Sequence, residues 1–160
     1  MKFFRFCMLL GVTAYAASAL GQTGADSKPL VQFSNPPELG TPNGYSYVAV
    51  VTGGKIVFIS GQVGLNKQGE MAGKNDFRAQ AMQAFSNLKA ALVASGAGFE
   101  NVVKLNYYVV GVNHDKLLAL REVRDQFINK AHPPTSTLAG VQALFREDAQ
   151  VEIEAVAVVP

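Results

Sequence analysis

Residues 151–158 read VEIEAVAV, and residues 131–137, a short distance before them, read AHPPTST. In the first segment Glu152 and Glu154 alternate with apolar residues, so a strand would carry both carboxylates on one face. In the second segment two prolines end any preceding helix and stiffen the entry to a strand that begins at Thr135. The segments predict two C-terminal strands. From the pattern alone, the glutamates fit a solvated edge face as well as a functional site.

The segment before the first predicted strand differs from the rest of the chain. Residues 22–44 are rich in proline and glycine and show little periodicity, which is typical of an arm or linker. We expect a single domain at residues 45–160. It begins with two strand candidates, residues 45–52 and 55–60, and the Gly53-Gly54 turn between them predicts a hairpin.

Helices and strands alternate in the middle of the chain. Asn75 can cap a helix with one apolar face, which stops at Ser95-Gly96. Residues 102–110 form a strong strand candidate. Asp115 can cap a second helix, which we expect to keep an inward face as far as Ala131.

The last two strands are expected at residues 135–144 and 150–158. The resulting order, β-β-α-β-α-β-β, predicts an α/β or α+β fold. In such a fold both helices cover one face of a mixed sheet. We see no internal repeat in the sequence.

The first 21 residues have the features of an export signal. Lys2 and Arg5 precede an apolar run at residues 6–20, which ends in small residues at 17–19. A transmembrane anchor is the alternative, but the run is short for a span, which needs about 20 apolar residues. We therefore expect residues 1–21 to be a signal peptide and the mature protein to be periplasmic or secreted.

Removing this signal changes the charge balance. The whole chain has 14 Lys and Arg against 12 Asp and Glu, and loss of Lys2 and Arg5 makes the mature chain formally neutral. A neutral chain offers no overall electrostatic attraction for nucleic acid or an anionic membrane.

The one cysteine, Cys7, is lost with the signal too, which excludes disulfides and thiol chemistry in the mature chain. His114 and His132 are isolated, with no spacing typical of a metal site.

Further motifs accompany the C-terminal segments: Asn43-Gly44-Tyr45-Ser46, Phe58-Ile59-Ser60-Gly61-Gln62, residues 79–96, residues 103–109 and Asn113. In order and spacing they resemble the reactive intermediate deaminase family (Rid, the YjgF-like proteins), with its "P-A-R-S/T" segment and "E-I-E-A-I-A" strand. The resemblance covers about residues 44–158. It implies the chorismate-mutase-like fold and a homotrimer with small-molecule clefts between its subunits.

The resemblance also assigns roles to residues at matching positions. Glu152 takes the place of the acid that positions or activates a water, so it is the expected catalytic residue. The expected substrate-binding residues are Tyr45, Ser60, Gly61, Asn113, Thr135, Ser136 and Thr137. Structural explanations stay open for some of them. These are turn chemistry at Ser60-Gly61, a core or interface position for Tyr45, and a helix-capping turn for Asn113.

One position departs from the family pattern. The arginine with which relatives hold a substrate carboxylate falls on Thr135, which offers one hydroxyl and no charge. Arg146, in the loop that follows, is a candidate replacement, and a solvated loop arginine is the alternative. We therefore expect weak activity, or none, on 2-iminopropanoate.

Two functions fit these observations. The first is an exported enzyme that hydrolyses imines or enamines to a carbonyl compound and ammonia, with an altered substrate range. The second is a non-catalytic small-metabolite-binding or scaffold protein on the same trimeric fold. Neither implies a cofactor, a metal, a nucleic-acid partner or, after signal cleavage, a membrane. The ribonuclease label of some relatives is disfavoured, because the mature chain is neutral and has no basic-aromatic pattern.

Overall fold

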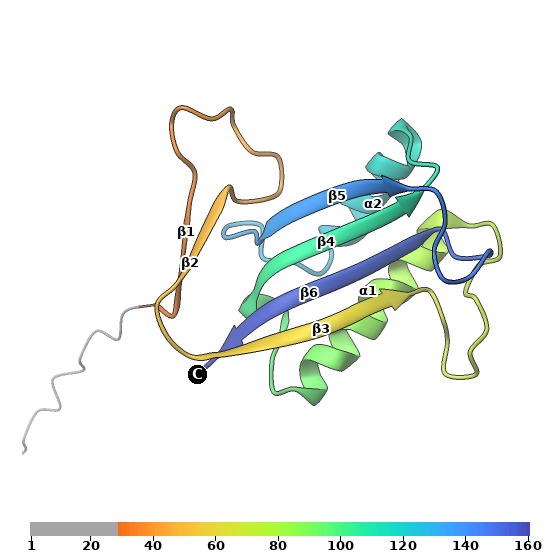
Figure 1. The fold of residues 1–160 in the computed structure, drawn as a ribbon, viewed down its shortest axis with the longest axis horizontal. Coiled ribbons are helices and arrows are strands. Elements are labelled where there is room, and N and C mark those ends of the chain that lie inside the picture. The colour runs from red at the N-terminus through yellow and green to blue at the C-terminus, as the bar shows by residue number, and fades with distance from the viewer. Residues whose placement is uncertain (1–28) are drawn as a thin grey trace, which may run out of the picture.

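The computed structural model describes residues 29–160, so the predicted signal peptide at residues 1–21 lies outside the described residues. The described part forms a four-stranded sheet, a two-stranded sheet and two α-helices (Figure 1). The strands are β1 (Val31–Ser34), β2 (Val48–Val51), β3 (Lys55–Val63), β4 (Val102–Val110), β5 (Thr135–Val141) and β6 (Val151–Val159). The helices are α1 (Phe77–Ala94), the 3-10 helix η1 (Phe99–Asn101) and α2 (His114–Arg124).

The four-stranded sheet is mixed and has the order β3-β6-β4-β5. The second strand in this order, β6, is antiparallel to both of its neighbours, whereas β5 is parallel to β4. Along β6, Val151 and Ile153 are fully buried while Glu152 and Glu154 are half-buried on the other face. The period-two pattern of the C-terminal segment is thus confirmed.

Both helices lie on the same side of this sheet (Figure 1). The fully buried Phe85 and Leu88 of α1 belong to one core cluster with Leu105 of β4 and Ile153 of β6. Burying each such side chain stabilises the fold by about 1.5–3 kcal/mol. The predicted arrangement, a mixed sheet with two helices on one face, is confirmed.

The first predicted helix cap is wrong by one residue. Asp76, not Asn75, caps α1, and its carboxylate accepts a hydrogen bond from the backbone N–H of Ala79 at 3.0 Å. Asn75 instead adopts a φ of 63°, in the left-handed region. Both residue types cap helices well, so the choice depends on backbone angles that the sequence pattern does not reveal.

The second predicted helix differs at both ends. Asn113, not Asp115, caps α2 by accepting a hydrogen bond from the N–H of Lys116 at 2.9 Å. The helix ends at Arg124, so Ala131 lies beyond it and is exposed. The prolines after Ala131 exclude a longer helix but do not require it to continue that far.

The hairpin predicted between residues 45–52 and 55–60 does not form. β2 pairs with β1, which lies in the segment predicted as an irregular arm, and β3 pairs with β6. Gly54, with a φ of 91°, turns the chain from one sheet into the other. A Gly-Gly turn predicts a change of direction, but the partner of each strand depends on contacts with distant residues.

The segment before β2 is joined to the entry of β5. The buried Ser46 donates two hydrogen bonds, from its N–H to the carbonyl of Pro134 at 3.1 Å and from its hydroxyl to the carbonyl of Pro133 at 2.7 Å. Ser46 also forms a parallel bridge with Thr135. These contacts hold the neighbouring Tyr45 at the edge of the sheet.

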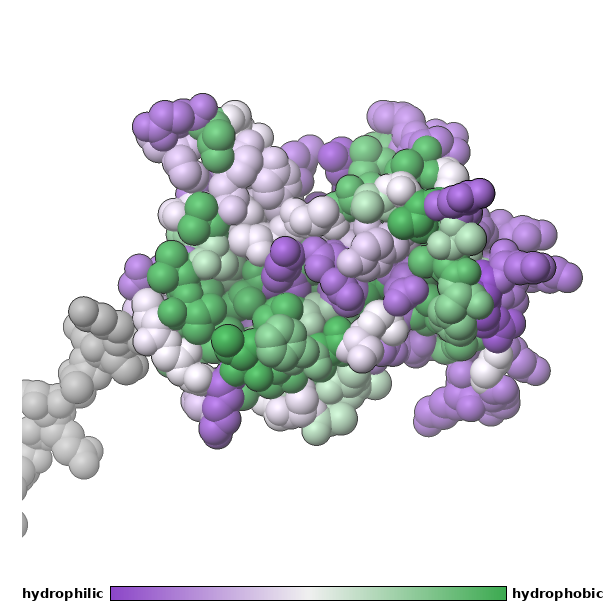
Figure 2. Space-filling model, in the orientation of Figure 1, coloured by the Kyte–Doolittle hydropathy of each residue, from purple (hydrophilic) through white to green (hydrophobic). Residues whose placement is uncertain are grey.

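The sheet face opposite the helices carries exposed apolar side chains. Phe58 of β3 is 78% exposed and Ile56 is 54% exposed. Figure 2 shows this face, with apolar surface extending over several elements. Among the described residues, no helix is long and apolar enough to cross a membrane.

Candidate functional site

An irregularity in β3, at Ser60 and Gly61, brings Gly61 against Glu152 of β6. The register between the two strands shifts between Ile59 and Gln62. A Cβ atom at Gly61 would lie 1.8 Å from Oε1 of Glu152, so only glycine leaves room for this carboxylate. The structure therefore brings two of the predicted site residues, Gly61 and Glu152, together, and Ser60 directly precedes Gly61.

The two glutamates of β6 differ in their hydrogen bonds. Glu154 accepts one from Nδ2 of Asn106 at 2.6 Å and one from the hydroxyl of Tyr108 at 3.1 Å. Within residues 29–160, Glu152 has no hydrogen-bond or ion-pair partner, although its side chain is half-buried. Glu154 is thus engaged in the structure, whereas the carboxylate of Glu152 is available to a water or a ligand.

Tyr108 and Asn106 are site residues that the sequence analysis missed. Tyr108 pairs with Glu152 in the register of β4 and β6. Its hydrogen bond to Glu154 raises the pKa of Tyr108, and burial and the charges of both glutamates add to this effect. Tyr108 therefore stays a protonated donor near neutral pH. Period-two alternation along residues 102–110 could have identified both residues.

A second group of predicted residues surrounds the entry of β5. Thr135, Ser136 and Thr137 line a cavity of about 440 Å³ together with Tyr45, Ser46, Tyr47 and Lys104. The hydroxyl of Thr135 donates a hydrogen bond to the carbonyl of Val103 at 2.9 Å. Lys104 supplies the cationic side chain of this cavity, and the sequence analysis missed it.

Within one chain the two groups lie apart. Thr135 pairs with Lys104, whereas Glu152 pairs with Tyr108, four residues farther along β4. At about 3.3 Å per residue the separation is about 13 Å along the strand, and β5 and β6 lie on opposite sides of β4. Asn113 follows the far end of β4, where its side chain caps α2. A small ligand cannot touch both groups of the same chain.

Arg146 is held by the loop between β5 and β6. Its guanidinium donates two hydrogen bonds to the carboxylate of Asp148, at 2.8 and 2.7 Å, and one to the carbonyl of Gly69 at 3.0 Å. The bond from Arg146 lowers the pKa of Asp148. This arrangement fits a structural loop arginine.

Comparison with known proteins identifies the family. Residues 39–159 match the family described as Endoribonuclease L-PSP. A solved structure from Yersinia pestis, YyfB of the conserved Rid protein family, aligns with a TM-score of 0.74 and 31% identity, over 82% of this chain and 100% of that chain. The chain belongs to the Rid family.

Other Rid proteins resemble this chain over most of their length. A 2-iminobutanoate/2-iminopropanoate deaminase from Dermatophagoides farinae is 36% identical over 113 residues, which are 71% of this chain and 85% of that protein. The structure of Escherichia coli TdcF with bound serine aligns with a TM-score of 0.58 and 27% identity, over 83% of this chain and 100% of that chain. The neighbours support the predicted chorismate-mutase-like Rid fold.

Metal ligands do not cluster in the described part of this Rid chain. No group of three or more His, Cys, Asp and Glu side chains within residues 29–160 could hold a metal ion. His114 begins α2 and His132 lies in an exposed turn.

Proposed function

We propose that this Rid-family protein hydrolyses an imine or enamine to a carbonyl compound and ammonia, with Glu152 directing the water. The observation that carries the proposal is the half-buried carboxylate of Glu152, which lies against Gly61 with no partner in the described chain. The deaminase name of the relative from Dermatophagoides farinae supports this class of reaction.

The proposed chemistry needs one group that accepts and returns protons. Glu152 accepts a proton from water as the water oxygen bonds to the imine carbon, and the electron pair of the C=N bond moves to nitrogen, which takes that proton. Glu152 then accepts the proton of the new hydroxyl and passes it to nitrogen as the C–N bond breaks. The products are a carbonyl compound and ammonia. Such proton transfer contributes about 10²- to 10⁴-fold to a rate.

The cleft would lie between the subunits of a homotrimer. In that arrangement the Glu152 group of one subunit and the Thr135 group of another face the same ligand, which removes the separation of about 13 Å within one chain. The exposed Phe58 and Ile56 provide an apolar surface suited to such an interface. Family membership supports the trimer, because Rid clefts are expected between subunits.

The substrate range would differ from that of arginine-bearing relatives. Thr135 has no charge, and its hydroxyl is already bonded to the carbonyl of Val103. Substrates would lack a carboxylate, or would place it near the ammonium of Lys104. A single ammonium binds a carboxylate as a point charge, without the two-pronged geometry of a guanidinium.

We also propose that the protein acts outside the cytoplasm. The support is the charged start, apolar run and small-residue site within residues 1–21. N-terminal sequencing of the native protein should find a start near Leu20 or Gln22. Intact Met1 on soluble cytoplasmic protein would contradict export.

The reaction is tested by following ammonia and carbonyl release from imines generated in situ by an amino-acid oxidase or an amine oxidase. We expect acceleration with carboxylate-free imines and at least a hundredfold loss in Glu152→Gln, which keeps the shape of the side chain. If the folded, trimeric wild type accelerates no imine, the non-catalytic binding or scaffold function replaces this proposal.

A further inference from the structure

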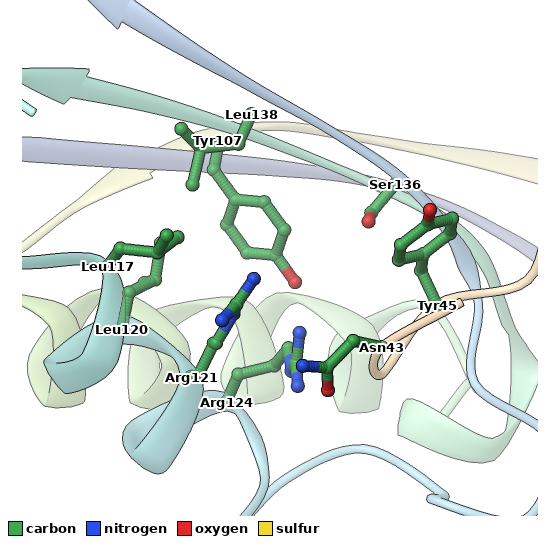
Figure 3. A pocket seen from close by; sticks show the side chains of 9 residues that line it. All are labelled: Asn43, Tyr45, Tyr107, Leu117, Leu120, Arg121, Arg124, Ser136 and Leu138. Carbon is green, nitrogen blue, oxygen red and sulfur yellow. The ribbon is translucent and has the colours of Figure 1, made fainter. Parts of the chain in front are cut away.

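A pocket of about 190 Å³ lies on the helix side of the sheet, between α2 and the edge strand β5 (Figure 3). Tyr107 of β4, Ser136 and Leu138 of β5, and Arg121 of α2 contribute to its wall. Tyr45, from the segment before β2, closes one side. The volume is smaller than the roughly 300–1,000 Å³ of drug-sized sites, so the pocket suits a small organic molecule.

This pocket is on the opposite face of the sheet from Glu152. Ser136 pairs with Leu105, and Leu138 pairs with Tyr107. Paired residues of neighbouring strands point to the same face, and both Leu105 and Tyr107 belong to the core beneath the helices. Glu152 points to the other face, opposite Tyr108. The pocket is therefore separate from the proposed water-directing group.

The hydroxyl of Tyr107 is an unused donor in this pocket. Tyr107 is only 4% exposed, and its hydroxyl has no hydrogen-bond partner within the described chain. It points toward the guanidinium groups of Arg121 and Arg124 (Figure 3). Burial raises the pKa of Tyr107, and the charge of Arg124 only partly opposes this effect. The phenol thus stays protonated. A buried donor left unpaired is unfavourable, so an acceptor at this position would be stabilising.

The two arginines of the pocket differ in their partners. The buried Arg124 donates from Nε and Nη2 to one carboxylate oxygen of Asp125, at 2.9 and 2.7 Å. Among residues 29–160, Arg121 forms no ion pair and no side-chain hydrogen bond, and it is half-buried. Arg121 therefore contributes a positive charge that no carboxylate of the described chain balances.

Gly44 allows the chain to approach Arg124 closely. It has a φ of 76°, and a Cβ atom there would lie 2.1 Å from Nη2 of Arg124. The close approach brings Asn43 and Tyr45 over the end of the pocket (Figure 3). The remaining wall is apolar and consists of Leu117, Leu120 and Leu138. The lining offers several donors and no carboxylate.

We propose that this pocket binds a small apolar monocarboxylate, with the carboxylate between Arg121 and the hydroxyl of Tyr107 and the tail against the leucines. A guanidinium and a phenol can both donate hydrogen bonds to one carboxylate. A single carboxylate would therefore balance the charge of Arg121 and accept a hydrogen bond from the hydroxyl of Tyr107. The leucine wall favours a short hydrocarbon tail over a second polar group. The proposal does not depend on the deaminase reaction.

The test is titration calorimetry on the purified protein with 4-methylpentanoate and, as the neutral control, 4-methylpentanamide. The carboxylate should bind at least tenfold more tightly than the amide. Arg121→Gln and Tyr107→Phe should each weaken binding of the carboxylate about tenfold or more, since each removes a donor to a charged group. Tyr107→Phe keeps the buried ring, so the fold should be retained.

Two control variants make the result specific. Arg78→Gln removes an exposed arginine of α1 that pairs with Glu122, and should leave binding unchanged. Glu152→Gln should also leave binding unchanged, because Glu152 lies on the other face of the sheet. Equal affinity for acid and amide, equal effects of Arg121→Gln and Arg78→Gln, or unchanged affinity in Tyr107→Phe would each overturn the proposal. Loss of binding in Glu152→Gln would place the ligand in the deaminase cleft and overturn it as well.

Discussion

The two halves of the candidate cleft differ in how far their polar groups are engaged. In the first half, Glu152 lies against Gly61 and its carboxylate has no partner in the described chain. In the second half, the hydroxyl of Thr135 is bonded to the backbone of Val103. The half that would direct water is thus kept free, while the position that would recognise a carboxylate is not. Because separate strands support the two halves, one can change while the other is retained.

The largest effect on deaminase activity is expected from a variant that prevents the subunits from assembling, because each cleft would then lack one of its halves. Phe58→Asp introduces a charge on an apolar surface where the native side chain is 78% exposed, so the folded subunit should be little affected. Light scattering should report a trimer for wild type at micromolar concentration and a monomer for the variant, which should lose deaminase activity entirely. A monomeric wild type, or a fully active monomeric variant, would contradict a cleft between subunits.

A large effect is also expected within the first half. Gly61→Ala places a Cβ where the carboxylate of Glu152 lies, so Glu152 must move. We expect activity to fall about a hundredfold, which is the lower part of the range for a lost acid-base group. The matched control is Gly53→Ala, whose added Cβ meets only Leu30 at an ordinary 3.5 Å. Equal activities of the two variants would show that the position of Glu152 does not matter.

A gain of function is expected within the second half. Thr135→Arg introduces a guanidinium at the position where the family resemblance implies recognition of a carboxylate, so hydrolysis of 2-iminopropanoate should rise about tenfold or more. The measurement is the rate of pyruvate and ammonia release. The rate with a carboxylate-free imine should not rise, and adding Glu152→Gln should remove any gain. A folded, trimeric variant without a gain would mean that the cleft has diverged beyond this residue.

The smallest effect concerns the loop that connects the strands of the two halves. Arg146 lowers the pKa of Asp148, so the folded state holds a proton at Asp148 less tightly than the unfolded chain does. The stabilisation is present above the unfolded value of about 3.9 and is lost as the pH falls through the lower folded value. Both side chains are more than a third exposed, which weakens the pair.

The measurement is the melting temperature of wild type, Asp148→Asn and the neighbouring control Glu147→Gln across this pH range. Wild type should melt above Asp148→Asn at pH 7, and the difference should shrink as the pH drops below about 3.9. Glu147→Gln should follow wild type. If the difference in melting temperature between wild type and Asp148→Asn grew on acidification, the pH dependence of the Arg146–Asp148 pair would be opposite to the one expected.

Local pattern was sufficient for much of the fold. The alternation in residues 151–158 predicts which side chains of β6 are buried, because successive residues of a strand face opposite sides. The apolar face of α1 follows from apolar residues at helical spacing, and the strand at residues 102–110 is also predicted from its local pattern. Where a choice depended on backbone angles, as between Asn75 and Asp76 at the cap of α1, the pattern predicted the place but not the residue.

The sequence by itself determined the order of the strands and α-helices from β2 to β6, the Rid resemblance and the candidate acid Glu152, but it missed β1. Only the tertiary structure decided that β1 pairs with β2, that Arg146 is held by Asp148 and Gly69, and that the hydroxyl of Tyr107 faces two arginines. It also placed Glu152 and the Thr135 group apart within one chain. The physical reason is the range of the interactions. Burial patterns follow from neighbouring residues, whereas strand partners, ion pairs and pockets depend on residues brought together from distant parts of the chain.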